Sequence, residues 1–129
     1  MTDKAPIKLK PVKWIASAKK DLLALPWEVK RAFGFALDQA QRGKKHEDAK
    51  PLKGFGGAGV LEVVEDYQSD TFRCVYTVRF ENAVYVLHVF QKKAKKGVAT
   101  PKPDMDLITQ RLKVAEADYI QWSKNNERH

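Results

Sequence analysis

Hydrophobic and polar residues along the chain follow two periods, one typical of strands and one typical of helices. Residues 12 to 15 alternate apolar with polar side chains and predict a short first strand. The next segment has apolar residues three and four positions apart and ends at Leu25. A second helix with an apolar stripe follows Pro26 and ends at Gly43. We expect these two helices to form a hairpin that packs on a sheet.

Three strand-like segments follow a glycine-rich stretch over residues 43 to 59, which is typical of a loop. The short connections between the segments predict an antiparallel meander. The three segments span 60–65, 71–80 and 83–91. In the middle segment, apolar residues alternate with a second set that includes Arg73 and Arg79. One face of this strand should therefore lie in the core and the other should present both arginines.

An apolar stripe from Met105 to Trp122 predicts a final helix. Its part around Tyr119 and Trp122 is either core or a surface for a partner protein or a second copy. The predicted order is βααβββα. This is an α+β domain in which an N-terminal helical hairpin and a C-terminal helix pack on a twisted antiparallel sheet. A chain of 129 residues suits one such domain, with flexible ends at about residues 1–8 and 124–129.

The composition excludes several classes of protein. One cysteine, Cys74, provides neither a disulfide framework nor a cysteine zinc cluster, and no two histidines are paired at helical spacing, so we expect no metal site and no cofactor. No apolar run approaches the roughly 20 residues that cross a bilayer, and no signal peptide is present, so we expect a cytoplasmic protein without a membrane partner. The net charge of +8 favours an acidic partner, which is nucleic acid, an acidic protein or an anionic membrane surface, and the composition does not choose among the three.

Basic residues gather in the glycine-rich loop, in the middle strand and after the last strand. The candidate phosphate-contacting side chains are Lys50, Lys53, Arg73, Arg79, Lys92, Lys93, Lys95 and Lys96. Because neighbouring strands of a meander run in opposite directions, Arg73 should share one end of the sheet with Lys92 and Lys93. A strand arginine beside a lysine pair offers a fork for phosphate. The alternative is that the lysine-rich loops only keep the protein soluble.

Two further side chains are candidates for nucleic-acid chemistry. His88 is the only histidine in a predicted strand, and it is either an ordinary core residue or a general base whose pKa range suits proton transfer. Phe55 is surrounded by glycines in the basic loop, so we expect it to be exposed and able to stack on a base of a single strand. The glycines do not form a nucleotide-binding loop, because no Gly-Lys-Ser/Thr sequence follows them.

Five short segments, in order over about residues 10 to 115, carry a resemblance to a known family. They read Lys50-Pro-Leu-Lys-Gly, Gly59-Val-Leu-Glu-Val, Phe72-Arg-Cys-Val-Tyr, Tyr85-Val-Leu-His-Val-Phe-Gln-Lys-Lys and Thr100-Pro-Lys. Together they resemble the RelE/ParE superfamily of bacterial toxins, especially its phage-derived HigB-like branch. The fold of that superfamily, helices packed on an antiparallel sheet, agrees with the order predicted from the hydrophobic pattern.

The resemblance implies a type II toxin that cleaves mRNA in the ribosomal A site and is neutralised by a cognate antitoxin, a helix-turn-helix protein. In such ribonucleases the ribose 2′-hydroxyl attacks the adjacent phosphate while basic side chains stabilise the developing charge. By the same resemblance, Arg73 would clamp the scissile phosphate. Lys93, with Lys92 beside it, would stabilise the transition state or protonate the leaving oxygen, and Lys53 would contact the RNA backbone.

The chain departs from the family pattern at two places. Val64 follows Glu62-Val63 where many relatives carry arginine, and no tyrosine lies between Lys95 and Thr100. Either Glu62 or His88 would then act as the base. Two alternatives stay open: a ParE-like gyrase inhibitor, and a non-catalytic RNA- or DNA-binding protein that uses the same basic face.

Overall fold

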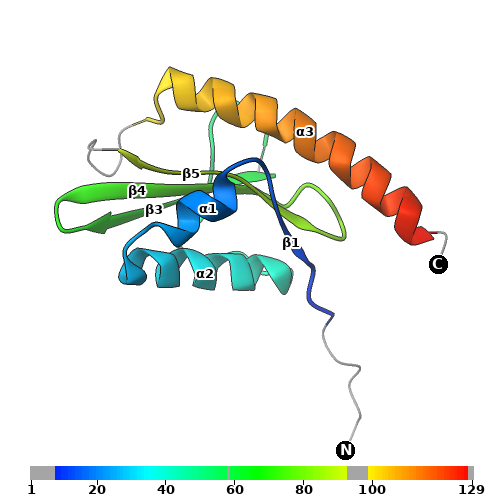
Figure 1. The fold of residues 1–129 in the computed structure, drawn as a ribbon, viewed down its shortest axis with the longest axis horizontal. Helices are drawn as coiled ribbons and strands as arrows, with labels where there is room; N and C mark the ends of the chain where they lie inside the picture. The colour runs from blue at the N-terminus through cyan, green and yellow to red at the C-terminus, as the bar shows by residue number, and fades with distance from the viewer. Residues whose placement is uncertain (1–7, 58, 93–98, 128–129) are drawn as a thin grey trace, which may run out of the picture.

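A five-stranded sheet lies between two layers of helix in the computed structural model, which describes residues 8–57, 59–92 and 99–127 (Figure 1). This arrangement confirms the predicted α+β fold. The elements in chain order are β1 (Val12–Trp14), α1 (Ala18–Leu23), α2 (Trp27–Gln41), β2 (Lys50–Pro51), β3 (Val60–Tyr67), β4 (Asp70–Thr77), β5 (Val84–Lys92) and α3 (Lys102–Glu127).

The strands lie in the order β1-β5-β4-β3-β2. Strands β3, β4 and β5 form the predicted antiparallel meander, and β5 has a neighbour on each side. The prediction of an entirely antiparallel sheet is wrong at one edge, because β1 pairs in parallel with β5, Val12 opposite Val84. A parallel partner is possible here because the whole helical hairpin and meander separate the two strands in sequence.

The stretch predicted as a loop before the meander contains the short strand β2. Lys50 lies opposite Glu62 of β3, so β2 adds a fifth strand at the edge next to β3. A two-residue strand with Pro51 at its end has no alternation for a sequence pattern to show. Strand β2 matters for the candidate site because it holds Lys50 beside the meander.

The helical hairpin packs on one face of the sheet, as predicted (Figure 1). The apolar stripe of α2 is buried in full, and it meets the hairpin-facing residues of β3, β4 and β5. The central members of this core are Val29, Phe33, Leu37, Val63, Phe72, Cys74, Tyr76 and Val86. Each buried aliphatic or aromatic side chain of this kind contributes roughly 1.5–3 kcal/mol through the hydrophobic effect.

Helix α3 crosses the opposite face of the sheet and forms a second core with it (Figure 1). This core contains Val60, Val75, Tyr85, Leu87, Ile108, Leu112 and Ala115. Tyr119 and Trp122 are half-buried and pack against it, with Tyr119 stacked on Phe80 at 4.6 Å between ring centroids. The helix runs to Glu127, so it continues into the segment that the sequence predicted as a flexible end. No helix in the described ranges combines the length and hydrophobicity that crossing a bilayer requires.

Strand β4 is covered on both faces, and the prediction of an open arginine face is therefore wrong. Every residue from Thr71 to Thr77 is buried. The alternation in the sequence correctly separated the two faces, but α3 covers the face that contains Arg73 and Val75. A second helical layer turns what reads as a half-exposed strand into a central one.

Tyr76 supplies a test of this packing. Its side chain is fully buried, and its hydroxyl has no hydrogen-bond partner within the described residues. Burial raises the pKa of this phenol above its ordinary value, with a smaller effect from Cys74. We expect Tyr76→Phe to raise the free energy of unfolding by about 1 kcal/mol, because the substitution removes a buried polar group that makes no bond.

Urea unfolding of both proteins measures this difference. Tyr85→Phe is the matched control, because the Tyr85 hydroxyl donates to Asp118 Oδ2 at 2.5 Å and its loss should destabilise the chain. Equal destabilisation by the two substitutions would contradict the interpretation of Tyr76.

Candidate active site

A cavity of about 470 Å³ opens between β2, β3, β4 and the segment that leads into α3. Four residues singled out from the sequence line it together: Lys50, Lys53, Glu62 and Arg73. The remaining lining residues are Asp48, Pro51, Leu52, Val64, Ala99, Thr100 and Met105. The structure thus brings charged side chains from β2, from the segment after it and from the meander into one concave site.

Arg73 and Glu62 form the polar wall of this cavity. They lie on adjacent strands as diagonal neighbours, since Arg73 pairs with Val64 and Glu62 pairs with Val75. Arg73 Nη1 donates to both carboxylate oxygens of Glu62 at 3.3 Å, and the two side chains are 2% and 13% exposed. A buried guanidinium beside a cavity is a strong donor for an anionic oxygen, because little water screens it.

Thr100 completes the wall. Its hydroxyl donates to Glu62 Oε2 at 2.7 Å and lies 3.4 Å from Arg73 Nη1. The carboxylate therefore has a fixed orientation, held by a strand arginine and by a hydroxyl from the chain before α3. This threonine belongs to the sequence motif Thr100-Pro-Lys, but its hydrogen bond with Glu62 follows only from the fold.

Lys50 and Lys53 form an exposed cationic rim around the buried pair. Strand β2 places Lys50 opposite Glu62, and the bond from Leu52 N to Val60 O at 2.9 Å holds the chain just before Lys53 against β3. Both lysines are exposed, as a phosphate-contacting rim requires. The cavity therefore combines a buried guanidinium with exposed surface charges of the same sign.

The predicted meeting of Arg73 with the end of the last strand is confirmed for Lys92. Arg73 lies opposite Phe90, and Thr71 lies opposite Lys92. The backbone of Lys92 thus stands two residues along the neighbouring strand from the arginine. Lys93, Lys95 and Lys96 lie outside the described residues.

Arg79 and Phe55 are placed away from the cavity. Arg79 follows the far end of β4, where its Nη2 donates to the carbonyl of Phe55 and its Nη1 lies 3.7 Å from Glu116. Its stem packs so closely on Gly59 that an added Cβ there would clash with Arg79 Cγ. Phe55 is half-buried against the second core, so the prediction that it is exposed is wrong. Glycines on either side of Phe55 let the loop fold back and bury the ring.

His88 is buried in a separate polar network beneath α3. Its Nε2 lies 2.9 Å from Asp104 Oδ1, and its Nδ1 lies 3.5 Å from Arg111 Nη1. Arg111 also donates to Ser17 at 3.3 Å, which ties α3 to the start of α1. No motif in the sequence marks Asp104 as a partner of this histidine. Because His88 does not line the cavity, its position fits orientation of α3 better than proton transfer at the cavity.

The environment of His88 predicts a pH dependence of stability. Burial lowers its pKa, and the charge of Arg111 adds to this effect against the opposing hydrogen bond with Asp104. Below about pH 6.5 the unfolded chain therefore binds more protons at this residue than the folded chain. The stability that neutral His88 contributes is complete above this pH and declines as the pH falls.

Urea unfolding between about pH 5 and pH 8 should show this decline in the parent chain and a smaller one in His88→Gln. The amide of glutamine can still donate to Asp104 but does not titrate. His46→Gln is the control, since His46 lies outside the network, and it should retain the parent's pH dependence. Identical slopes for His88→Gln and the parent would contradict the assignment.

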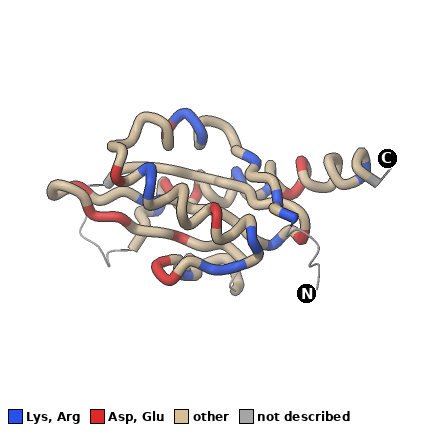
Figure 2. Tube along the Cα trace, turned by 90° about the horizontal axis from the view of Figure 1, so that it is seen from below, with Lys and Arg blue, Asp and Glu red and all other residues tan. Residues whose placement is uncertain are grey.

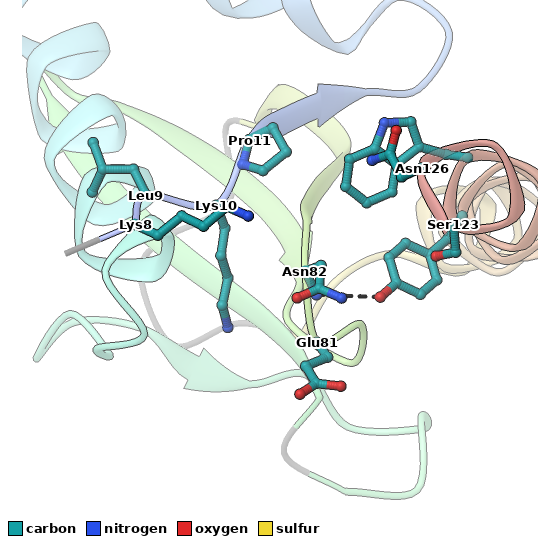
Figure 3. Close-up of a pocket in the computed structure, with 10 residues that line it drawn as sticks. Lys8, Leu9, Lys10, Pro11, Glu81, Asn82, Ser123 and Asn126 are labelled. Atoms are coloured by element: carbon teal, nitrogen blue, oxygen red, sulfur yellow. Dashed lines mark hydrogen bonds between the residues drawn. The ribbon is translucent and has the colours of Figure 1, made fainter. Parts of the chain in front are cut away.

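A second cavity of about 710 Å³ lies near the opposite end of α3. Figure 3 shows Lys8 and Lys10 from the N-terminal segment on one side and Ser123 and Asn126 from α3 on the other. The backbone N–H of Asn82 donates to the Tyr119 hydroxyl at 3.2 Å within it. None of the candidate site residues lines this cavity, so the smaller one, with its buried charged pair, is the better candidate for chemistry. The described residues also contain no group of three potential metal ligands close enough to hold an ion.

Comparison with known proteins links the chain to a family and to two solved structures. The family described as phage derived protein Gp49-like matches residues 20–113, which include most of α1, all of α2, strands β2 to β5 and the cavity. A double mutant of the Escherichia coli toxin RelE in the free state shares 20% identity and a TM-score of 0.49, over 63% of this chain and 81% of that one.

The Mycobacterium tuberculosis toxin–antitoxin complex RelBE2 shares 23% identity and a TM-score of 0.45, over 71% of this chain and 100% of that one. No curated protein matches the sequence.

Proposed function

We infer a function from the premise that the chain belongs to the phage-derived Gp49-like family. This membership confirms the phage-derived assignment made from the sequence. We propose that the chain is the toxin of a type II toxin–antitoxin system and acts as an endoribonuclease on ribosome-bound mRNA. The observation that carries the proposal is the cavity in which Arg73, Glu62, Lys50 and Lys53 converge.

The first chemical task is to hold and polarise a phosphodiester. The exposed Lys50 and Lys53 attract the RNA backbone, and the guanidinium of Arg73 lies behind them in the wall of the cavity. A buried donor of this kind stabilises the negative charge that develops on the phosphate oxygens, which is commonly the largest single catalytic effect. Entry of a phosphate would replace part of the Glu62 contact with Arg73.

The second task is proton transfer. In the proposed reaction Glu62 takes the proton of the ribose 2′-hydroxyl, the 2′-oxygen forms a bond to the adjacent phosphorus, and the bond from phosphorus to the 5′-oxygen breaks. The products are a 2′,3′-cyclic phosphate and a 5′-hydroxyl, and the leaving oxygen takes its proton from a lysine. We assign this last role to Lys93 or Lys92 from the sequence. The fixed orientation of Glu62 by Thr100 supports it as the base in preference to His88.

The proposed partners follow from the same site. An RNA substrate on the ribosome places the protein in the cytoplasm, and an antitoxin that neutralises it would have acidic residues to cover the rim of the cavity. The excess of positive charge, +8 in all, favours both associations.

Induced expression followed by mapping of RNA ends tests the proposal. Protein synthesis should stop, and translated messages should acquire new 5′-hydroxyl ends. Arrest of DNA replication with intact messages would replace the proposal with a gyrase inhibitor. Binding of RNA without new ends would leave a non-catalytic RNA-binding protein.

A further inference from the structure

The outer face of the helical hairpin exposes large apolar side chains. Leu23 at the end of α1 is 58% exposed, and Trp27 and Phe35 on α2 are 66% and 56% exposed. The buried stripe of α2 faces the sheet, so Trp27 and Phe35, which are absent from it, lie on the solvent side with Arg31 between them. Exposed aromatic residues on a helix are the type that most often anchors protein interfaces.

These side chains form one continuous surface, which we call the hairpin stripe: Leu23, Trp27, Arg31, Gly34 and Phe35. The Lys30 ammonium donates to the carbonyl of Leu23 at 3.4 Å, so the end of α1 adjoins the first turns of α2. Residues three and four positions apart on α2 then extend the surface to Phe35. The stripe therefore extends from the end of α1 along the solvent side of α2.

Gly34 lies in the stripe at a position where the fold does not require glycine. An added Cβ would find no atom within 4 Å, and the residue is exposed. Glycine in the middle of a helix costs about 1 kcal/mol relative to alanine. A glycine that the fold does not require, set between two exposed aromatic residues, leaves room for the backbone or side chains of another molecule.

The charges around the stripe select the partner. Between residues 18 and 45 the chain has seven basic residues and three acidic ones. The three acids already have partners within the chain: Asp21 with Ser17 at 2.7 Å, Glu28 with Tyr67 at 3.2 Å and Asp38 with Arg42 at 3.1 Å. Figure 2 views the molecule from the hairpin side of the sheet and marks the Lys and Arg positions along the chain. The rim of the stripe is therefore basic.

We propose that the hairpin stripe is a docking surface for an amphipathic helix of another protein, one with an apolar face flanked by acidic residues. A second copy of the chain fits poorly, because a two-fold interface would bring the same basic rim against itself. The cavity with Arg73 and Glu62 lies on the α3 side of the sheet, so a partner on the stripe leaves it open. The proposal therefore does not rest on ribonuclease activity.

The test uses a synthetic helical peptide of 15 residues, the length of α2, with leucines on one face and glutamates on the other. A second peptide has lysine in place of every glutamate. Titration into the full chain, followed by tryptophan fluorescence and calorimetry, should show the glutamate peptide binding at least about tenfold more tightly than the lysine peptide.

Three variants should each weaken binding of the glutamate peptide by about tenfold or more: Trp27→Ala, Phe35→Ala and Gly34→Gln. None of them should appreciably lower the midpoint of urea unfolding. Val114→Ala and Ile120→Ala, which remove comparably exposed apolar side chains from α3, are the controls and should bind like the parent. Equal binding of the two peptides, or parent-like binding by Trp27→Ala, would overturn the proposal. So would a dimer that Trp27→Ala dissociates, or binding to phosphatidylglycerol vesicles in preference to the glutamate peptide.

Discussion

RNA cleavage by Glu62→Gln is expected to be about 10²–10⁴ times slower than cleavage by the parent chain, because the amide cannot accept the proton of the 2′-hydroxyl. The substitution keeps the shape of the side chain, and its oxygen can still accept from Thr100, which is 2.7 Å from Glu62 Oε2 in the parent. The chain should therefore still fold, with a lower thermal midpoint, because Arg73 keeps an acceptor oxygen but loses its charged partner. Cleavage of a translated message on purified ribosomes, with the thermal midpoint measured alongside, gives both quantities.

Glu65→Gln is the matched control for this experiment. Glu65 lies on the same strand, three residues further along, opposite Phe72 and outside the lining of the cavity. Its substitution changes the net charge by the same amount and should leave cleavage unchanged. If both variants cleave like the parent, Glu62 is not the base. If both lose activity together, the effect is one of net charge and not of the cavity.

The hydrophobic pattern of the sequence predicts most of the fold because each pattern repeats over many residues. The stripe of α2 repeats over four turns, and the alternation in β4 extends over eight residues, so chance patterns compete poorly. The parallel pairing of β1 and the existence of β2 could not be predicted in this way. Both depend on long-range contacts of very short segments, whose own residues carry almost no signal.

In the candidate site, too, some features follow from the sequence and others depend on long-range contacts. Arg73 and Lys53 could be singled out because they belong to recognisable motifs, and the register of the meander explains why Arg73 and Lys92 share one end of the sheet. The pairing of Arg73 with Glu62 was not predictable, because it needs the exact diagonal register of β3 on β4 together with the cover that α3 provides. The glycine neighbours of Phe55 predict an exposed ring, but the ring is half-buried against the second core. Glycines therefore also allow a loop to fold inward.

Arg73→Ala is expected to lower the free energy of unfolding by about 3–5 kcal/mol, because it leaves the Glu62 carboxylate in the wall of the cavity without its guanidinium. Arg73 and Glu62 are only 2% and 13% exposed, so water entering the cavity compensates the lost guanidinium only in part. Cleavage should also fall by about 10²–10³-fold or more, the usual effect of removing one donor that stabilises developing negative charge. A loss of toxicity by this variant would therefore have two causes, the lower stability of the fold and the missing donor in the cavity.

A double substitution separates them. In Arg73→Met with Glu62→Leu both charges are absent and apolar volume fills their place, a change that is often neutral for stability. We expect this variant to unfold at nearly the urea concentration of the parent and to cleave no RNA. Arg79→Ala is the control for the loss of one arginine, since its pair with Glu116 is partly exposed and contributes at most about 1 kcal/mol. A stable double variant that still cleaves RNA would place the chemistry away from the cavity, whereas a stable and inactive one assigns it to the Arg73–Glu62 pair.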